Sequence, residues 1–196
     1  MKKQIIISIG REHGSGGHKI GRMLAEAYGI EFYDSNILKE IAEEKNVESK
    51  SLDKFDEAPK KFFSSRRVRG ESNSPEEAVA HMEFDFLKKK ADEGESFVVL
   101  GRLADAVLAD NEGLVKIFLY CNDKDFKLGR IMKEFNISEN EAERMREKYD
   151  KDRRSYHDYY ADSKWGERES YDLLIDSGKL GIEKSFELIK NYIELK

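Results

Sequence analysis

Apolar residues along the chain gather in short runs that predict the strands of a sheet. The runs lie at residues 4–9, 97–100, 115–120 and 172–175, with a weaker run at 30–33. Three of the first four are nearly continuous in β-branched or large apolar residues, a pattern typical of strands covered on both faces. We therefore expect a parallel sheet, because parallel sheets carry helices on both sides.

Between the runs, apolar positions recur with the period of a helix. Residues 17–28 have apolar side chains three and four positions apart, and Gly29 follows as a residue that suits a left-handed helix end. A last apolar stripe extends from Ile182 to Ile193. Strands that alternate with such helices predict an α/β domain of three layers with right-handed crossovers.

Two further helices are predicted from their N-terminal signals. Ser74 can cap a helix in which Pro75 takes the first position and Glu77 completes a capping box. Ser138 and Glu141 have the spacing of a second capping box. Each signal marks the expected start of a helix.

Two polar segments interrupt the core elements. Residues 45–73 are poorly periodic and rich in Ser, Lys and Arg, and residues 123–169 have dense charge of both signs. We assign the core of a single domain to residues 1–44, 74–122 and 170–196, with the two polar segments as insertions.

The composition indicates a soluble protein with a highly charged surface. Charged residues make up 38% of the 196 residues, and no apolar run approaches the about 18 residues that a membrane span requires. The N-terminal lysines precede a short apolar run without a cleavage site, so this run is interpreted as a strand and not as a signal peptide. Cys121 is the only cysteine, which excludes an internal disulfide and favours a cytoplasmic protein. The net charge of −5 argues against nucleic-acid binding by the domain as a whole.

The stretch GREHGSGGHKIG, residues 10–21, lies between the first strand and the first helix, where a phosphate-binding loop is expected. A P-loop of the form G-x-x-x-x-G-K-[ST] would place Lys and then Ser or Thr where this chain has Gly17 and His18. The backbone part of the site is retained, because a glycine turn and a helix N-terminus both direct N–H groups at a phosphate. The residues expected to hold donor phosphates are Gly14, Ser15, Gly16, Gly17, His18 and Lys19.

The side-chain part of this loop has changed. A P-loop lysine reaches the β- and γ-phosphates, and the neighbouring hydroxyl helps to hold Mg²⁺. Lys19, Arg11 or an arginine from elsewhere could supply the missing charge, and Ser15 has a hydroxyl. The alternative is a glycine-rich turn that binds no ligand.

Several segments form an ordered set of motifs along almost the whole chain. They are ISIGREHGSGG, FYDSNIL, VVLGR, the arginine-bearing segment near residues 144–154, and YDLLIDSGKLGIE. Together they resemble the cytidylate kinase-like family, a branch of the P-loop nucleoside monophosphate (NMP) kinases whose loop commonly has glycine in place of the lysine. The resemblance implies a P-loop NTPase fold with a central five-stranded parallel sheet, an NMP-binding insertion at about 45–73 and a LID-like region at about 123–169. It also implies ATP as the phosphoryl donor with Mg²⁺, and a pyrimidine nucleoside monophosphate, CMP or dCMP, as the acceptor.

Two residues that follow strands are candidates for binding the acceptor. Arg102 comes directly after the run at 97–100, and ligands of open α/β sheets bind beyond the carboxyl ends of strands. The resemblance gives this arginine a contact to the acceptor, with a surface arginine at a helix start as the alternative. Asp34 ends the weak strand, and the resemblance places it near the acceptor or a metal. A helix cap formed by Asp34 or Ser35 is the alternative.

The segment 144–154 supplies candidate cations for phosphoryl transfer. This reaction depends on positioning and on cations around the transferring group, and guanidinium groups stay charged and grip phosphate oxygens in pairs. Asp150 and Arg153 resemble part of the LID motif, whereas Arg146 lies one position too far from Asp150 to match its first arginine. Arg153 is therefore the principal candidate, with Arg130 as a second. A solvated helix face with i,i+4 ion pairs is the alternative.

Residues 60–69 combine five basic residues with two phenylalanines and no acid. Such a strip can hold single-stranded nucleic acid through charge and stacking. By the resemblance, Arg66 or Arg67 would instead meet the acceptor phosphate. The four histidines lack metal-ligand spacing, so no metal site built from protein ligands alone is predicted.

The first hypothesis is therefore an ATP-dependent pyrimidine nucleoside monophosphate kinase with nucleotides as its partners and no membrane association. The second is a nucleotide-binding protein on a kinase scaffold without efficient transfer, and the third is a nucleic-acid-binding module. Acceptor base and oligomeric state are left open. In the first hypothesis Arg153, Lys19 and Arg130 are catalytic, Arg11 binds the donor together with the glycine loop, and Asp34, Arg66, Arg67 and Arg102 bind the acceptor.

Overall fold

The fold is built around the parallel five-stranded sheet that the apolar runs predict. The computed structural model describes residues 4–45, 67–68, 71–72 and 74–196. Every strand pair in the sheet is parallel, and Ile6 of the central strand lies between Phe97 and Leu114 in the register. In spatial order the strands are β2 (Glu31–Tyr33), β5 (Phe97–Leu100), β1 (Ile6–Arg11), β6 (Leu114–Tyr120) and β7 (Leu173–Asp176).

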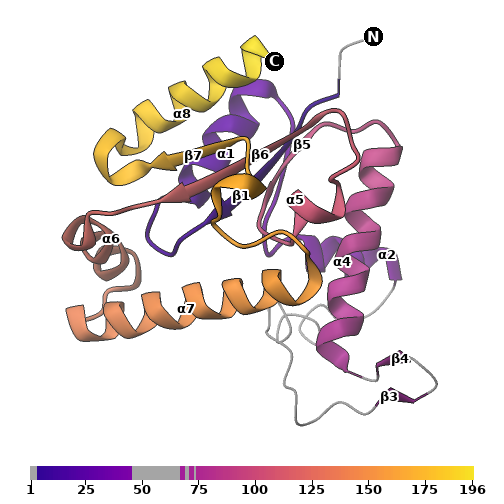
Figure 1. Ribbon diagram of the computed structural model, residues 1–196, viewed down its shortest axis with the longest axis horizontal. Coiled ribbons are helices and arrows are strands. Elements are labelled where there is room, and N and C mark those ends of the chain that lie inside the picture. The colour runs from indigo at the N-terminus through magenta and orange to yellow at the C-terminus, as the bar shows by residue number, and fades with distance from the viewer. Residues whose placement is uncertain (1–3, 46–66, 69–70, 73) are drawn as a thin grey trace.

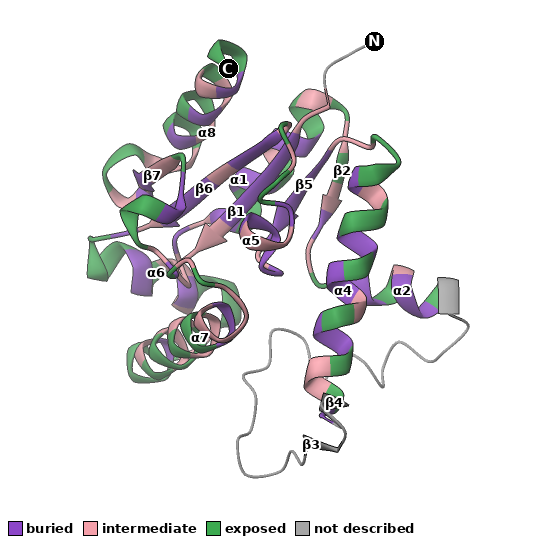
Figure 2. Ribbon diagram, turned by 45° about the vertical axis from the view of Figure 1, so that its right-hand side comes forward, coloured by how far each residue is buried: buried purple, intermediate pink, exposed green. Residues whose placement is uncertain are grey.

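Helices cover both faces of the sheet, which gives the three layers expected from the sequence (Figure 1). On one face, Ile7 and Ile9 of β1 pack with α1 (Gly17–Tyr28) and α8 (Ser177–Leu195). On the other face, Ile6 packs in a cluster with residues of α2 (Ile37–Lys45), α4 (Pro75–Asp92) and α5 (Ala104–Val107). Figure 2 shows the consequence, with the central strands buried over most of their length and the outer faces of the helices exposed.

The ends of the first strand and first helix are set by identifiable contacts. The first strand is shifted two residues from its predicted range, because the Gln4 side chain donates to the carbonyls of Ala91 and Glu95 and the ladder begins at Ile6. Helix α1 has the predicted bounds. Gly29 ends it in the left-handed region, at φ 63°, as predicted.

The two predicted capping boxes have different outcomes. The box at Ser138 is confirmed, because the Glu141 carboxylate accepts from the backbone N–H of Ser138 at 2.9 Å. The box at Ser74 is wrong, since Ser74 makes no side-chain bond to the backbone of α4. Its hydroxyl donates instead to the carboxylate of Glu76.

The segment 123–169 is mostly helical. It contains α6 (Lys124–Phe135), α7 (Glu139–Tyr160) and a short 3₁₀ helix, η2 (Arg168–Ser170). A buried contact fixes the end of α7 to the core, because Nε2 of His157 lies 2.8 Å from Oδ2 of Asp105 in α5. Helix α7 thus runs past the carboxyl ends of the strands, near the end of β1, as Figure 1 shows.

Within the segment 45–73, the described backbone forms β3 (Arg67–Val68) and β4 (Glu71–Ser72), which pair antiparallel near the start of α4. Among the helices that the structure describes, none combines the length and apolar character needed to cross a membrane.

Candidate functional site

The loop between β1 and α1 has a backbone that depends on its glycines. Gly14 and Gly16 adopt φ values of 79° and 85°, in the left-handed region that favours glycine. A Cβ atom at Gly14 would lie 2.7 Å from Cγ of Lys127, and one at Gly16 would lie 2.2 Å from Cδ1 of Ile182. The loop is therefore tightly enclosed by α6 and α8.

The start of α1 offers backbone donors to an anion. The helix begins at Gly17, so the N–H groups of its first turn have no intrahelical acceptor. Gly16 at the N-cap supplies no side-chain cap, and the first turn contains no acidic residue. Free amides and the positive end of the helix dipole together suit a phosphate.

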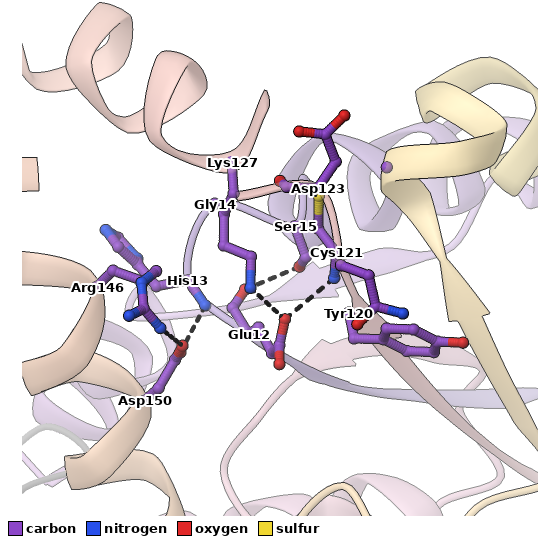
Figure 3. A network of polar contacts seen from close by, with 12 residues as sticks. Glu12, His13, Gly14, Ser15, Tyr120, Cys121, Asp123, Lys127, Arg146 and Asp150 are labelled. Atoms are coloured by element: carbon purple, nitrogen blue, oxygen red, sulfur yellow. Dashed lines mark hydrogen bonds and ion pairs between the residues drawn. The ribbon is translucent and has the colours of Figure 1, made fainter. Parts of the chain in front are cut away.

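A partly buried ion pair braces the loop from beneath (Figure 3). Nζ of Lys127 lies 2.5 Å from Oε2 of Glu12, and the same carboxylate oxygen accepts the backbone N–H of Cys121 at 3.0 Å. The Ser15 hydroxyl donates to the carbonyl of Glu12 at 2.8 Å, and the Ser177 hydroxyl donates to the carbonyl of Ser15 at 2.6 Å. These contacts fix both sides of the loop before any ligand binds.

Helix α7 makes a direct contact to the same loop. Oδ1 of Asp150 accepts the backbone N–H of His13 at 2.6 Å, as Figure 3 shows. Two arginines of α7, Arg146 and Arg153, each place a guanidinium nitrogen 3.9 Å from the Asp150 carboxylate. Burial raises the pKa of this carboxyl above its usual range, while the His13 amide and the Arg153 charge act in the opposite direction. Asp150 therefore couples the arginines of α7 to the glycine loop.

His13 is a neutral ring in this site at neutral pH. Burial, together with the charges of Arg153 and Arg11, lowers the pKa of His13 to about 4. Its ring stacks on Tyr149 with 4.7 Å between the ring centroids. The guanidinium of Arg153 lies 5.6 Å from the centroid of the same Tyr149 ring, so these side chains form one layered group.

A cleft of about 660 Å³ opens above the loop. The loop forms its floor, and Tyr149 and Phe135 lie on its wall. Asp34 and His18 lie together in the wall formed by α1 and the end of β2, with Oδ2 of Asp34 2.9 Å from Nε2 of His18. Among the residues that the structure describes, the arginines that line the cleft are Arg11, Arg102, Arg130 and Arg153.

Arg102 reaches the cleft from the end of β5 and is buried, with 3% of its side chain exposed. Its Nη1 donates to Oε1 of Glu83 at 3.1 Å, in α4. Burial first, and then the nearby charge of Arg11, lowers the pKa of Arg102 to about 9. Arg102 therefore remains a cation at neutral pH. The backbone of Arg102 and of Leu103 is left-handed, with φ values of 58° and 57°. Strained backbone of this kind is concentrated at functional sites.

Arg130 and Arg153 reach the cleft from α6 and α7. Nη1 of Arg130 donates to the carbonyl of Gly14 at 3.1 Å, and its guanidinium lies 4.2 Å from the centroid of the Phe126 ring. Arg153 has 14% of its side chain exposed. Arg130 and Arg153 therefore approach the loop from two different helices, α6 and α7.

The structure does not bring every predicted site residue into the cleft. The Lys19 side chain is 64% exposed on the outer side of α1, where Nζ lies 3.4 Å from Oε1 of Glu183. Ser15 is buried, and its hydroxyl is used within the loop. Gly14, Gly16, Gly17 and His18 do line the cleft, as do the candidates Asp34 and Arg102. Lys19 and Ser15 are therefore not among the residues that line the cleft.

The alternatives left open by the sequence are partly resolved. Arg102 is not a surface arginine, because it is buried against Glu83. Asp34 contributes to the start of α2, since Oδ1 accepts the N–H of Asn36 at 3.0 Å, but its other oxygen faces His18 in the cleft. Helix α7 has a solvated face with an i,i+4 pair between Lys148 and Asp152. Both residues of this pair also line the cleft, together with Arg153.

The predicted basic strip lies mostly outside the described residues. Arg66 falls there, and Arg67 is described only as backbone of β3. Sequence reasoning missed Glu12, Lys127 and Glu83, which position the loop and Arg102. The Glu12 of the GREHG stretch was visible in the sequence, but nothing local indicated its partner.

Comparisons with known proteins identify a family to which the chain is similar. The model of the cytidylate kinase-like family matches residues 6–179. A cytidylate kinase from Methanopyrus kandleri is 25% identical over 200 residues, which cover 97% of this chain and 93% of that protein.

Solved structures support the fold. An uncharacterized protein from Eubacterium ventriosum superimposes with a TM-score of 0.78 at 35% identity, over 98% of this chain and all (100%) of the other. A shikimate kinase from Bacteroides thetaiotaomicron superimposes with a TM-score of 0.54 at 15% identity, over 97% and 98% of the two chains. The second likeness concerns the fold alone.

Proposed function

The chain belongs to the cytidylate kinase-like family, and we propose that it transfers a phosphoryl group from ATP to a pyrimidine nucleoside monophosphate, CMP or dCMP. The observation that carries this proposal is the cleft in which α1 begins and four arginines converge. Phosphoryl transfer requires this combination of fixed backbone donors and cations more than it requires a covalent or acid–base group. The relationship to the Methanopyrus kandleri cytidylate kinase supports the choice of acceptor class.

On the donor side, the loop and the first turn of α1 would hold the phosphates of ATP. The amides in the first turn of α1 have no intrahelical acceptor, and Arg130 and Arg153 add charge from α6 and α7. Mg²⁺ usually binds through one or two carboxylates and the substrate phosphates. Asp34 fits this role because its carboxylate lies in the cleft wall, and the metal would neutralise charge on the phosphates.

On the acceptor side, Arg102 and Asp34 would contact the nucleoside monophosphate. Both lie beyond the carboxyl ends of strands, where ligands of open α/β sheets bind. Residues 45–73, which include Arg66 and Arg67, would form the NMP-binding insertion, and residues 123–169 would form the LID.

The reaction needs no general base from the protein. An oxygen of the acceptor phosphate forms a bond to the γ-phosphorus of ATP, and the bond from that phosphorus to the β–γ bridging oxygen breaks. ADP leaves with the bridging oxygen, and the acceptor becomes a diphosphate. Arg153 lines the cleft beside Asp150 and would stabilise the transferring phosphoryl group.

An assay of ADP formation with ATP and Mg²⁺ tests the proposal. We expect turnover with CMP or dCMP, and lower kcat/KM with UMP, AMP and small alcohols. Preference for any acceptor outside the pyrimidine monophosphates would overturn the acceptor assignment. Tight binding of ATP without turnover on any acceptor would favour a nucleotide-binding protein on a kinase scaffold, the second hypothesis.

A further inference from the structure

Gly17 stands where a P-loop has its lysine, and the structure gives a steric reason for the glycine. The residue is the first of α1 and is buried. Its φ is outside the left-handed region, so the backbone conformation alone does not require glycine. A Cβ atom at this position would lie 3.1 Å from Cβ and 3.2 Å from Cγ of Arg11, closer than side-chain atoms normally approach.

The stem of Arg11 therefore occupies the space in which a side chain at position 17 would begin. Arg11 is the last residue of β1, the central strand, and its side chain lines the cleft. From these two observations we infer that Arg11 replaces the P-loop lysine, with its guanidinium contacting the β- and γ-phosphates of the donor nucleotide. In this arrangement the cation comes from the end of β1 instead of from the start of α1. Glycine at position 17 leaves the space that the Arg11 side chain occupies.

The electrostatic surroundings of Arg11 agree with this position. Its charge contributes to the lowered pKa of His13 and also to that of Arg102, and both of these residues line the cleft. The guanidinium is thus close to the ligand side of the loop. A guanidinium also suits two phosphates better than an ammonium does, because it presents donors in a planar fork.

The neighbouring lysines are placed elsewhere. Lys19 extends to Glu183 on the outer side of α1. Lys127 has 8% of its side chain exposed and is engaged with Glu12 beneath the loop. Lys19 is therefore held outside the cleft, and Lys127 is already paired with the Glu12 carboxylate, whereas Lys148 of α7 lines the cleft and pairs with Asp152.

The inference rests on the proposed use of a nucleoside triphosphate donor, but it can be tested without an acceptor. Isothermal titration calorimetry would measure the affinities of ATP, ADP and AMP in the presence of Mg²⁺. We expect Arg11→Ala to weaken ATP and ADP binding by about ten- to hundredfold and to leave AMP nearly unchanged, because only the longer phosphate chains reach this residue. Arg168→Ala is the matched control, since Arg168 is 86% exposed and pairs with Glu169.

A second set of variants tests whether side chains at positions 11 and 17 compete for the same space. Gly17→Lys alone should impair ATP binding, because the new side chain competes with the Arg11 stem for the same space. Arg11→Ala together with Gly17→Lys removes the Cγ contact at 3.2 Å and keeps the Cβ contact at 3.1 Å, so it should restore part of the lost ATP affinity. Thermal unfolding of each variant separates loss of the site from loss of the fold.

Several outcomes would overturn the inference. These are an Arg11→Ala protein that keeps its ATP affinity, a loss that is equal for ATP and AMP, or a wild-type chain that does not bind ATP more tightly than AMP. Loss of ATP binding in Lys19→Ala, with none in Arg11→Ala, would return the role to the helix lysine. Failure of CMP phosphorylation with normal ATP binding would contradict only the acceptor assignment and would leave the role of Arg11 intact.

Discussion

Replacing Gly16 by alanine should destabilise the protein more than Gly29→Ala does, for two separable reasons. The residue has φ 85°, and a non-glycine residue in the left-handed region costs about 1–2 kcal/mol. The new methyl group would also lie 2.2 Å from Cδ1 of Ile182, and overpacking of this kind costs about 1–3 kcal/mol. The expected loss in free energy of unfolding is the sum, about 2–5 kcal/mol.

Two other glycines separate these contributions. Gly29 has φ 63° but no atom within 4 Å of its missing Cβ, so Gly29→Ala should show the backbone cost alone. Gly129 lies inside α6 with the same open space and no left-handed φ, so Gly129→Ala should be neutral or stabilising by up to about 1 kcal/mol. Urea denaturation monitored by circular dichroism measures all three.

The reasoning would be refuted if Gly16→Ala cost no more than Gly29→Ala, because the contact with Ile182 would then carry no penalty. A double variant, Gly16→Ala with Ile182→Ala, provides a second check. It should be less destabilised than the sum of its single changes, because the shortened side chain removes the collision. Strict additivity would show that α8 does not enclose the loop as described.

Three further predictions concern the cleft and its supports. Arg153→Ala should lower kcat with little change in the free energy of unfolding, and unchanged turnover would remove this residue from the mechanism. His157→Ala should cost about 3–5 kcal/mol in urea denaturation, because it leaves the Asp105 carboxylate buried without its partner; a cost below 1 kcal/mol would show that this contact does not fix α7. The pKa of His13 is about 4 in the folded protein and about 6.5 for a histidine in the unfolded chain, so between these pH values the unfolded chain binds one more proton than the folded protein. The free energy of unfolding should therefore rise as the pH increases from 4 to 6.5, by about 1–2 kcal/mol after solvent screening. His13→Gln should flatten that part of the pH profile. An unchanged slope in this variant would contradict the burial of a neutral His13 ring.

The parts of the fold that follow from local pattern were predictable from the sequence. Near-continuous apolar runs specified the strands of the parallel sheet, and the helical period with Gly29 specified both ends of α1. Ser138 and Glu141 form a capping box because both partners lie within one turn. The capping box at Ser74 failed because its hydroxyl is engaged by Glu76, one position before the expected partner.

The parts of the site that depend on distant partners were not predictable. Glu12 and Lys127 are 115 positions apart, and His13 and Asp150 are 137 apart. No local rule connects such pairs, so the bracing of the loop required the structure. Lys19 lies outside the cleft for a geometrical reason, because a helix turns about 100° per residue and position 19 therefore faces about 200° away from position 17.

The electrostatics of the cleft favour a polyanionic ligand over a neutral one. Arg11, Arg102 and Arg153 come from three different elements and converge on one volume, although like charges disfavour such an arrangement in a partly buried site. Burial first, and then the charges of Arg11 and Arg153, lower the pKa of Arg102 to about 9, so its protonated form is less favoured there than in water. A chain of phosphates in contact with the loop amides would relieve that repulsion, and the free energy gained would appear as binding affinity. In the arrangement inferred above, Arg11 at the end of β1 supplies the positive charge that a P-loop lysine at the start of α1 would supply. The loss of that lysine is therefore compatible with a working phosphate site.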